Sequence, residues 1–251
     1  MQYKFISVLK DNYIWVLYNN KNEALIFDCG DATATLAFLH ENGLKLKYIL
    51  VTHHHYDHID GVVAVAKATG ALVVGNSHFK DILPPLDIKV ENDGVYNFLG
   101  QVVEVKSAPG HCQDLIVYYF KLNKWLFCSD LLFSLGCGGI FDGSLEQMVN
   151  SLKMLSIFPQ DALLFCGHEY AKSNLKFLQS LNIFDTTEIQ EKINSSDYNS
   201  PTTLDFEYKY NPFLNLDNKK LLDTLLLSDS DNSSVFQRLK YLKAKSLVIR
   251  K

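Results

Sequence analysis

One short segment of this chain concentrates side chains that bind metal ions. Residues 53–58 read HHHYDH and follow the apolar run Tyr48-Ile49-Leu50-Val51. Neutral imidazole nitrogens and carboxylate oxygens are typical ligands of borderline divalent metals. A histidine cluster can also be a purification tag or a solvated loop. The internal position after a strand excludes the tag, and a loop has no need of the final Asp-His pair, so the segment predicts a metalloenzyme.

Three further candidate ligands each follow an apolar run, as His53 does. His111 comes after residues 102–105 and a turn, Asp130 follows residues 125–128, and His168 follows residues 163–167. Loops at strand ends, carried by a rigid sheet, are where functional groups concentrate. The sequence therefore predicts that these loops converge on one site.

The spacing within the histidine segment predicts two metal ions. His53 and His55, two apart in an extended loop, can face one ion, while the Asp57-His58 pair at the start of the next helix faces another. The candidates exceed the four ligands of a tetrahedral zinc, but two ions that share a carboxylate can use them all and leave positions for water. We predict one ion on His53, His55 and His111, the other on Asp57, His58 and His168, and Asp130 as the bridge.

Sheets covered by helices must position these loops, because strand-like and helix-like runs alternate up to residue 168. Strands are predicted at 14–18, 24–28, 48–52, 71–74, 102–106, 115–120, 125–128 and 163–166, with hairpin turns at 92–94 and 122–123. Helices are predicted at 34–41, 61–68 and 145–158, and then at 170–181, 187–194, 218–227 and 234–244, with a loop around 200–203. We therefore divide the chain into a β-rich domain, 1–168, and a smaller helical domain, 169–251.

Composition is that of a globular protein. The chain has 251 residues, 47% of them hydrophobic, and a net charge of -4, which gives no support to a nucleic-acid partner. No apolar stretch approaches the roughly 20 residues of a membrane span, and the start lacks a secretion signal, so we expect a cytoplasmic protein without a membrane partner. An odd set of 5 cysteines without a Cys-x-x-Cys pair argues against a disulfide framework, and Cys128 and Cys166 are expected in the core.

The histidines outside the predicted ligand set are expected to bind no metal. His54 is expected to point away from the metals, and His40 and His78 are expected to have no functional role.

At this point several motifs together resemble the metallo-β-lactamase superfamily and, within it, the glyoxalase II family of hydroxyacylglutathione hydrolases. Beside residues 52–58, the matching segments are 11–15, 109–111, 129–130, 136–138, 167–170, 174–177 and 211–214. The metal motif alone is typical of the superfamily; the Gly-Cys-Gly segment, the His-Glu-Tyr segment and the helical tail narrow the resemblance. It implies an α/β protein, an αββα sandwich with a C-terminal helical substrate-binding domain. The seven predicted ligands match the family's own, which hold zinc, with iron or manganese as alternatives.

The resemblance also implies a reaction. The family hydrolyses S-(2-hydroxyacyl)glutathione thioesters, typically S-D-lactoylglutathione to glutathione and D-lactate, the second step of methylglyoxal detoxification. In the mechanism that we expect, a hydroxide between the two ions, held by Asp57 and Asp130, attacks the thioester, and one ion stabilises the oxyanion. We expect a monomer.

The resemblance implies only some of the residues that would bind the glutathione part of the substrate. Tyr170 matches the family's tyrosine, and Lys240 with Lys243 matches a basic pair on a late helix. Gly139 and Phe141 stand where the family has a basic residue and a tyrosine. From the residues alone, the two lysines are i and i+3 neighbours on one helix face and could equally be a solvated face.

Other reactions remain open on the same fold. A thioesterase for non-glutathione substrates, a lactonase or a phosphodiesterase could use the same dinuclear centre. The departures from the family pattern at Gly139 and Phe141 keep these reactions as alternatives. A mononuclear iron persulfide dioxygenase belongs to a different class, which oxygen uptake with glutathione persulfide would support. A metal-binding regulatory protein without turnover is disfavoured by the complete ligand set.

Overall fold

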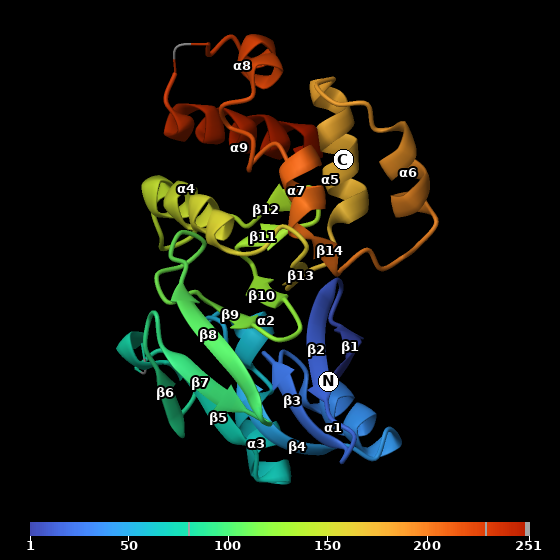
Figure 1. Ribbon diagram of the computed structural model, residues 1–251, viewed down its shortest axis with the longest axis vertical. Helices are drawn as coiled ribbons and strands as arrows, with labels where there is room; N and C mark the ends of the chain where they lie inside the picture. Colours follow the sequence, from blue (N-terminus) through green and yellow to red (C-terminus); the bar gives the residue numbers. More distant parts are fainter. Residues whose placement is uncertain (80, 229, 249–251) are drawn as a thin grey trace.

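The computed structural model describes residues 1–79, 81–228 and 230–248, with side chains through Lys245. Two six-stranded sheets face each other and carry helices on their outer faces, so the αββα sandwich is confirmed (Figure 1). The last residues of the predicted helical domain, 249–251, lie outside the described part of the chain.

The first sheet has the strand order β1-β2-β3-β4-β5-β6. Strands β1 to β3 are antiparallel and β3 to β6 are parallel, and helices α1 and α3 pack on the outer face. Helix α1 begins where the Asp31 side chain accepts a hydrogen bond from the Ala34 amide, which satisfies a free helix-end donor. The bounds are β1 Gln2–Val8, β2 Asn12–Tyr18, β3 Glu23–Phe27, α1 Ala32–Glu41, β4 Lys45–Leu50, α2 Tyr56–Ile59, α3 Val62–Thr69, β5 Leu72–Asn76 and β6 Ile88–Val90.

The second sheet has the order β14-β13-β10-β9-β8-β7, and α4 packs its buried face on the same core. A short hairpin, β11 and β12, follows β10. The bounds are β7 Val95–Phe98, β8 Gln101–Ser107, β9 Ile116–Phe120, β10 Trp125–Ser129, β11 Leu132–Phe133, β12 Gly136–Cys137, α4 Leu145–Met154, β13 Leu163–Cys166 and β14 Thr202–Thr203.

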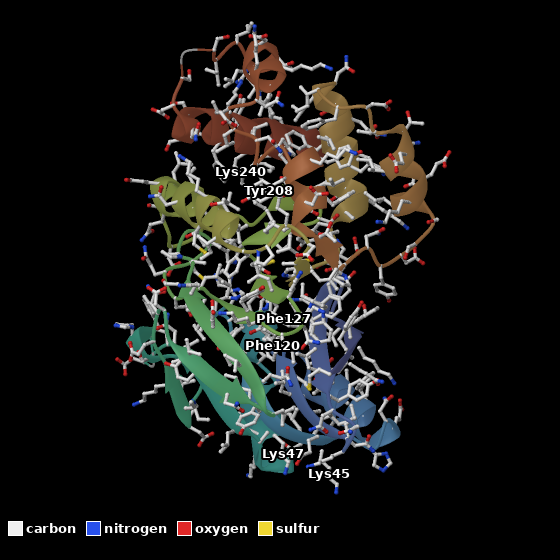
Figure 2. All side chains as sticks on the ribbon, viewed as in Figure 1. Lys45, Lys47, Phe120, Phe127, Tyr208 and Lys240 are labelled. Carbon is white, nitrogen blue, oxygen red and sulfur yellow. The ribbon has the colours of Figure 1, made fainter. Side chains whose placement is uncertain are left out.

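Aromatic side chains fill the space between the two sheets. The rings of Phe27 on β3 and Phe127 on β10 stack with centroids 3.7 Å apart, and Phe120 on β9 meets Phe127 edge-on (Figure 2). Because β3 runs parallel to β4, and β10 parallel to β13, the residues that follow these strands leave each sheet at a common edge. The stacked core therefore sets the distance between the loops that carry the candidate ligands.

The helices after residue 168 gather at one end of the molecule, at the top of Figure 1. They are α5 Ala171–Leu181, α6 Thr187–Asn194, α7 Leu204–Tyr210, α8 Lys219–Leu225 and α9 Asn232–Val248. In the described part of the chain, no helix combines the length and the apolar character that crossing a membrane requires.

Some local expectations were wrong. The predicted hairpin turn at 92–94 joins β6 to β7, which belong to different sheets, whereas the turn at 122–123 does join the antiparallel pair β9 and β10. The expected loop at 202–203 is the strand β14, which pairs with β13, so the C-terminal part of the chain also contributes to the second sheet. The pairing of so short a strand depends on its neighbour in space, which local sequence does not report.

Candidate metal centre

Three histidines from two loops meet in the first cluster. The Nδ1 atom of His55 lies 3.2 Å from Nε2 of His53 and 2.8 Å from Nε2 of His111. His53 is fully buried, His111 nearly so, and His55 is half-buried. Nitrogens this close can share a single cation as ligands. These are the residues that the sequence analysis placed on one ion.

A second cluster unites the helix α2 with the loop after β13. The Nε2 atoms of His58 and His168 are 3.3 Å apart, and Asp57 Oδ2 lies 3.6 Å from the first and 3.4 Å from the second. This trio of donors is also close enough for one cation. It contains the residues predicted for the other ion.

Asp130 lies between the two clusters. Its Oδ2 is 3.5 Å from Nε2 of His111 and 3.3 Å from Nε2 of His168, and its Oδ1 is 3.5 Å from Nε2 of His58. The carboxylate thus borders both trios, as a bridging ligand must. The division of the seven side chains between two ions remains a prediction.

The chemistry of these groups fits divalent metal ions. Burial, together with the neighbouring His58, lowers the pKa of His53 well below its usual value, which keeps its ring neutral and able to donate a lone pair. Burial opposes ionisation of Asp130, but the His58 and His168 rings hold the pKa of its carboxyl well below the usual range. Its Oδ1 atom is buried and has no hydrogen-bond partner among the described residues, as expected of an oxygen that faces a cation.

The backbone around Asp130 is shaped to deliver its side chain. The pairing of β10 with β13 shifts register between Phe127 and Ser129, and Ser129 has φ 45°, in the left-handed region. Gly167 gives the carboxylate room, because a Cβ at that position would lie 2.2 Å from Asp130 Oδ1. Only a residue without a side chain fits beside the carboxylate here.

Two carboxylates behind the clusters contact histidines that are predicted metal ligands. Asp28 Oδ2 is 2.9 Å from Nδ1 of His58, and Asp11 Oδ1 is 2.9 Å from Nδ1 of His168. Each contact directs the Nε2 atom of its ring into the site, the usual support of a metal-binding histidine. The side-chain amide of Asn12 donates a hydrogen bond to Asp57 Oδ2 over 2.9 Å and so orients a carboxylate that is a predicted ligand.

Asp11, Asn12 and Asp28 were not among the predicted site residues, although residues 11–15 are one of the segments that carry the resemblance. Asp28 carried a signal that could have been used, because it directly follows the buried strand β3, as the predicted ligands follow theirs. Asp11 ends the turn between β1 and β2, and Asn12 is the first residue of β2. Their position does not reveal that they contact His168 and Asp57, which are far away in the sequence.

One cavity of about 550 Å³ opens onto both clusters, and several predicted substrate contacts line it. The Tyr170 ring stacks on His168 with centroids 5.0 Å apart. The Phe141 ring meets His55 and His111 edge-on, with centroids 5.0 and 5.2 Å apart, and is 71% exposed. Gly139 lines the cavity and contributes its carbonyl, which accepts a hydrogen bond from His111 Nδ1 over 2.9 Å.

The predicted lysine pair on α9 is not a freely solvated face. Both side chains are partly buried, and both ammonium groups lie over the Phe213 ring, 5.7 Å from its centroid for Lys240 and 5.8 Å for Lys243. Lys240 Nζ also donates to the Gly138 carbonyl over 2.7 Å, on the side of α9 that faces the β-rich domain (Figure 2). The pair therefore adjoins the segment that ends at the cavity, and its role in binding substrate remains a prediction.

The remaining histidines and the cysteines behave largely as expected. His40 is exposed on α1, and His78 is an exposed neighbour of Glu91. His54 turns away from the two clusters toward Asp114. The cysteines, Cys128 and Cys166 among them, are all buried and free of disulfides.

Comparison with known proteins agrees with this geometry. Residues 10–168 match the family model of the metallo-beta-lactamase superfamily, and residues 169–246 match that of the hydroxyacylglutathione hydrolase C-terminus. The hydroxyacylglutathione hydrolase of Chromohalobacter salexigens is 37% identical, with 94% of this chain and 95% of the relative covered. That of Vibrio parahaemolyticus is 35% identical, with 97% and 98% covered.

Solved structures share the fold. The BLEG-1 B3 metallo-beta-lactamase superposes with a TM-score of 0.69 at 24% identity, over 85% of this chain and all (100%) of that one. The ETHE1 protein from Myxococcus xanthus gives a TM-score of 0.71 at 20% identity, over 96% and 91% of the two chains. With the histidine and aspartate clusters, the superfamily match identifies a site for divalent metal. The chain belongs to the metallo-β-lactamase superfamily and, within it, to the hydroxyacylglutathione hydrolase family.

Proposed function

We propose that this protein hydrolyses S-(2-hydroxyacyl)glutathione thioesters, with S-D-lactoylglutathione as the typical substrate and glutathione and D-lactate as products. The observation that carries the proposal is the arrangement of two ligand trios around Asp130 at the floor of a single cavity. Family membership points to the same reaction, because the relatives bear the name of this hydrolase. Neither a lactonase nor a persulfide dioxygenase is favoured by these relatives.

We infer that the site holds two divalent ions, zinc or, as alternatives, iron or manganese. His53, His55 and His111 would hold one, Asp57, His58 and His168 the other, and Asp130 both. When bound, such a pair of ions lowers the pKa of water and polarises a carbonyl group, which supplies both a nucleophile and stabilisation of the oxyanion. The imidazole-rich ligand set suits zinc and iron better than magnesium or calcium.

The chain's own groups would bind and orient the thioester. In this proposal residues 1–168 supply the metal ligands, and residues 169–251 supply most contacts to the glutathione arm. Lys240 and Lys243 place two positive charges side by side, suited to a glutathione carboxylate. Burial raises the pKa of the Tyr170 hydroxyl, so it stays protonated at neutral pH and can donate a hydrogen bond to the substrate.

Departure of the thiol needs no dedicated acid. A thiolate is stable near neutral pH, unlike an amine leaving group, so protonation is not required for the bond to break. This agrees with the cavity, where the lining acidic groups are Asp57 and Asp130, both predicted metal ligands.

A panel of thioesters tests the proposal. We expect metal-replete protein to hydrolyse S-D-lactoylglutathione with a kcat/KM at least about tenfold above that for the lactoyl thioester of N-acetylcysteamine, which lacks the glutathione carboxylates; tenfold corresponds to about 1.4 kcal/mol of binding. Chelation should abolish turnover, and zinc should restore it. Equal rates on both thioesters would remove the glutathione specificity, and no thioester turnover at all would overturn the proposal. Oxygen uptake with glutathione persulfide would identify the dioxygenase instead.

A further inference from the structure

A histidine, a thiol and a carboxylate meet outside the proposed dinuclear centre. The ligand atoms of His54, Cys112 and Asp114 all lie within 4.8 Å of one another. Cys112 and Asp114 have no exposed surface, while the His54 side chain is partly exposed. Imidazole nitrogen, thiolate sulfur and carboxylate oxygen are the three donor types that zinc binds in proteins.

One carboxylate oxygen of Asp114 is buried without a hydrogen-bond partner among the described residues. This oxygen is Oδ2, whereas Oδ1 lies 2.7 Å from His54 Nδ1. Buried carboxylate oxygens are normally paired, and an unpaired one is costly. The Cys112 thiol lies beside this carboxylate, and burial together with the Asp114 charge raises the pKa of that thiol. The cluster therefore offers a sulfur atom and a carboxylate oxygen that a cation could use.

The cluster joins the two loops that carry the first trio of metal ligands. His54 lies between His53 and His55, and Cys112 directly follows His111. The amide of Asn76 donates to the Asp114 backbone carbonyl over 3.1 Å, which anchors the second loop to β5. A cation held by these loops would connect them without entering the substrate cavity, which none of the three residues lines.

We propose that His54, Cys112 and Asp114 bind a structural zinc ion, separate from the dinuclear centre. Binding replaces the thiol proton of Cys112, which passes to solvent, and forms a sulfur-metal bond. The thiolate and the carboxylate together balance the two positive charges, so the buried unit is neutral. Water completes the coordination on the exposed side of His54. This site goes beyond the proposed hydrolase activity and fastens His53, His55 and His111 relative to one another.

The test compares metal binding by three full-length proteins: the unchanged chain, Cys112→Ser and Cys29→Ser. Cys29 is the control because its buried thiol lies 3.4 Å from the Thr35 hydroxyl, where a serine can also bond, and because it belongs to none of the candidate metal clusters in the described residues. After saturation with zinc and dialysis, we expect Cys112→Ser to retain one equivalent less than the other two. With cobalt in place of zinc, the unchanged chain and Cys29→Ser should show thiolate-to-cobalt charge-transfer absorption, and Cys112→Ser should lose it.

Equal metal content in all three proteins, with no thiolate absorption in the unchanged chain, would overturn the site. If Cys112→Ser does not fold, the cobalt spectrum of the unchanged chain still decides, because no other thiol belongs to a candidate cluster in the described residues. Asp114→Asn, which keeps the size of the side chain, should likewise lose the extra equivalent. Thioester hydrolysis is not the readout, so failure of this site and failure of the proposed function are seen separately.

Discussion

The floor of the cavity, formed by the two ligand clusters and Asp130, and its rim, formed by Gly139, Phe141 and Tyr170, are built differently. On the floor, rings predicted to bind metal are buried and contact a carboxylate on the side away from the site, as His58 contacts Asp28 and His168 contacts Asp11. On the rim, Phe141 is 71% exposed, and its ring meets the rings of His55 and His111 edge-on. Because a buried group held by several contacts is costly to replace, we expect substitutions on the rim to affect metal binding less than substitutions on the floor. Gly139 and Phe141, where the resemblance implies a basic residue and a tyrosine, both line the cavity.

Removing the carboxylate shared by both clusters should have the largest effect. We expect Asp130→Ala to lose metal from both sites together and to lower kcat by roughly a thousandfold, comparable to the loss of a group that stabilises the transition state. Metal analysis after dialysis and steady-state kinetics measure this. His53→Ala serves as the comparison, because it should weaken one site first. Two retained ions with full turnover in Asp130→Ala would show that the bridging assignment is wrong.

The second-largest effect is expected from removing a carboxylate that contacts a predicted metal ligand. Asp28→Asn removes the charge that orients His58, and we expect metal affinity to fall by about 10- to 100-fold, the usual cost of losing such a partner. Competition with a chelator measures the affinity. Asp161→Asn, at an exposed aspartate paired with Lys124, should leave it unchanged. If both variants bound metal alike, the carboxylate behind His58 would have no part in holding the ion.

Substrate binding should depend on pH through the lysine pair on α9. Burial lowers the pKa of Lys243 to about 8, so its positive charge is present below pH 8 and is lost as the pH rises through that value. We expect KM for S-D-lactoylglutathione to rise above pH 8. Lys243→Gln should show a KM about tenfold higher at pH 7, as for a lost charged hydrogen bond, and should lose this pH dependence. Lys245→Gln, exposed on the same helix, should behave as the unchanged chain; a shared profile for all three would remove Lys243 from the substrate site.

The smallest effect is expected at Tyr170, where only a hydroxyl is removed and the stacked ring remains. Tyr170→Phe should raise KM about threefold to tenfold, the cost of one hydrogen bond, and change kcat less, because binding to the ground state and to the transition state is lost equally. Metal content should not change. Initial-rate kinetics separate the two constants, and an unchanged KM would mean that the hydroxyl does not contact substrate.

Much of the fold could be predicted because its signals are local. Apolar runs marked strands such as β10 and β13, and the polar residue after each of these strands marked a candidate ligand. Short elements were missed for the opposite reason. Thr202–Thr203 is a strand only because β13 lies beside it.

The sequence by itself determined which side chains could bind metal, because ligand type and strand-end position are properties of a few neighbouring residues. Only the tertiary structure decided which groups support them. Asp28 is 30 residues from His58, and Asp11 is 157 residues from His168, yet each pair is in hydrogen-bond contact. The placement of Lys240 against Gly138, 102 residues away, is of the same kind. Such pairings follow from the packing of the two sheets against each other and against the C-terminal helices. This packing depends on residues throughout the chain.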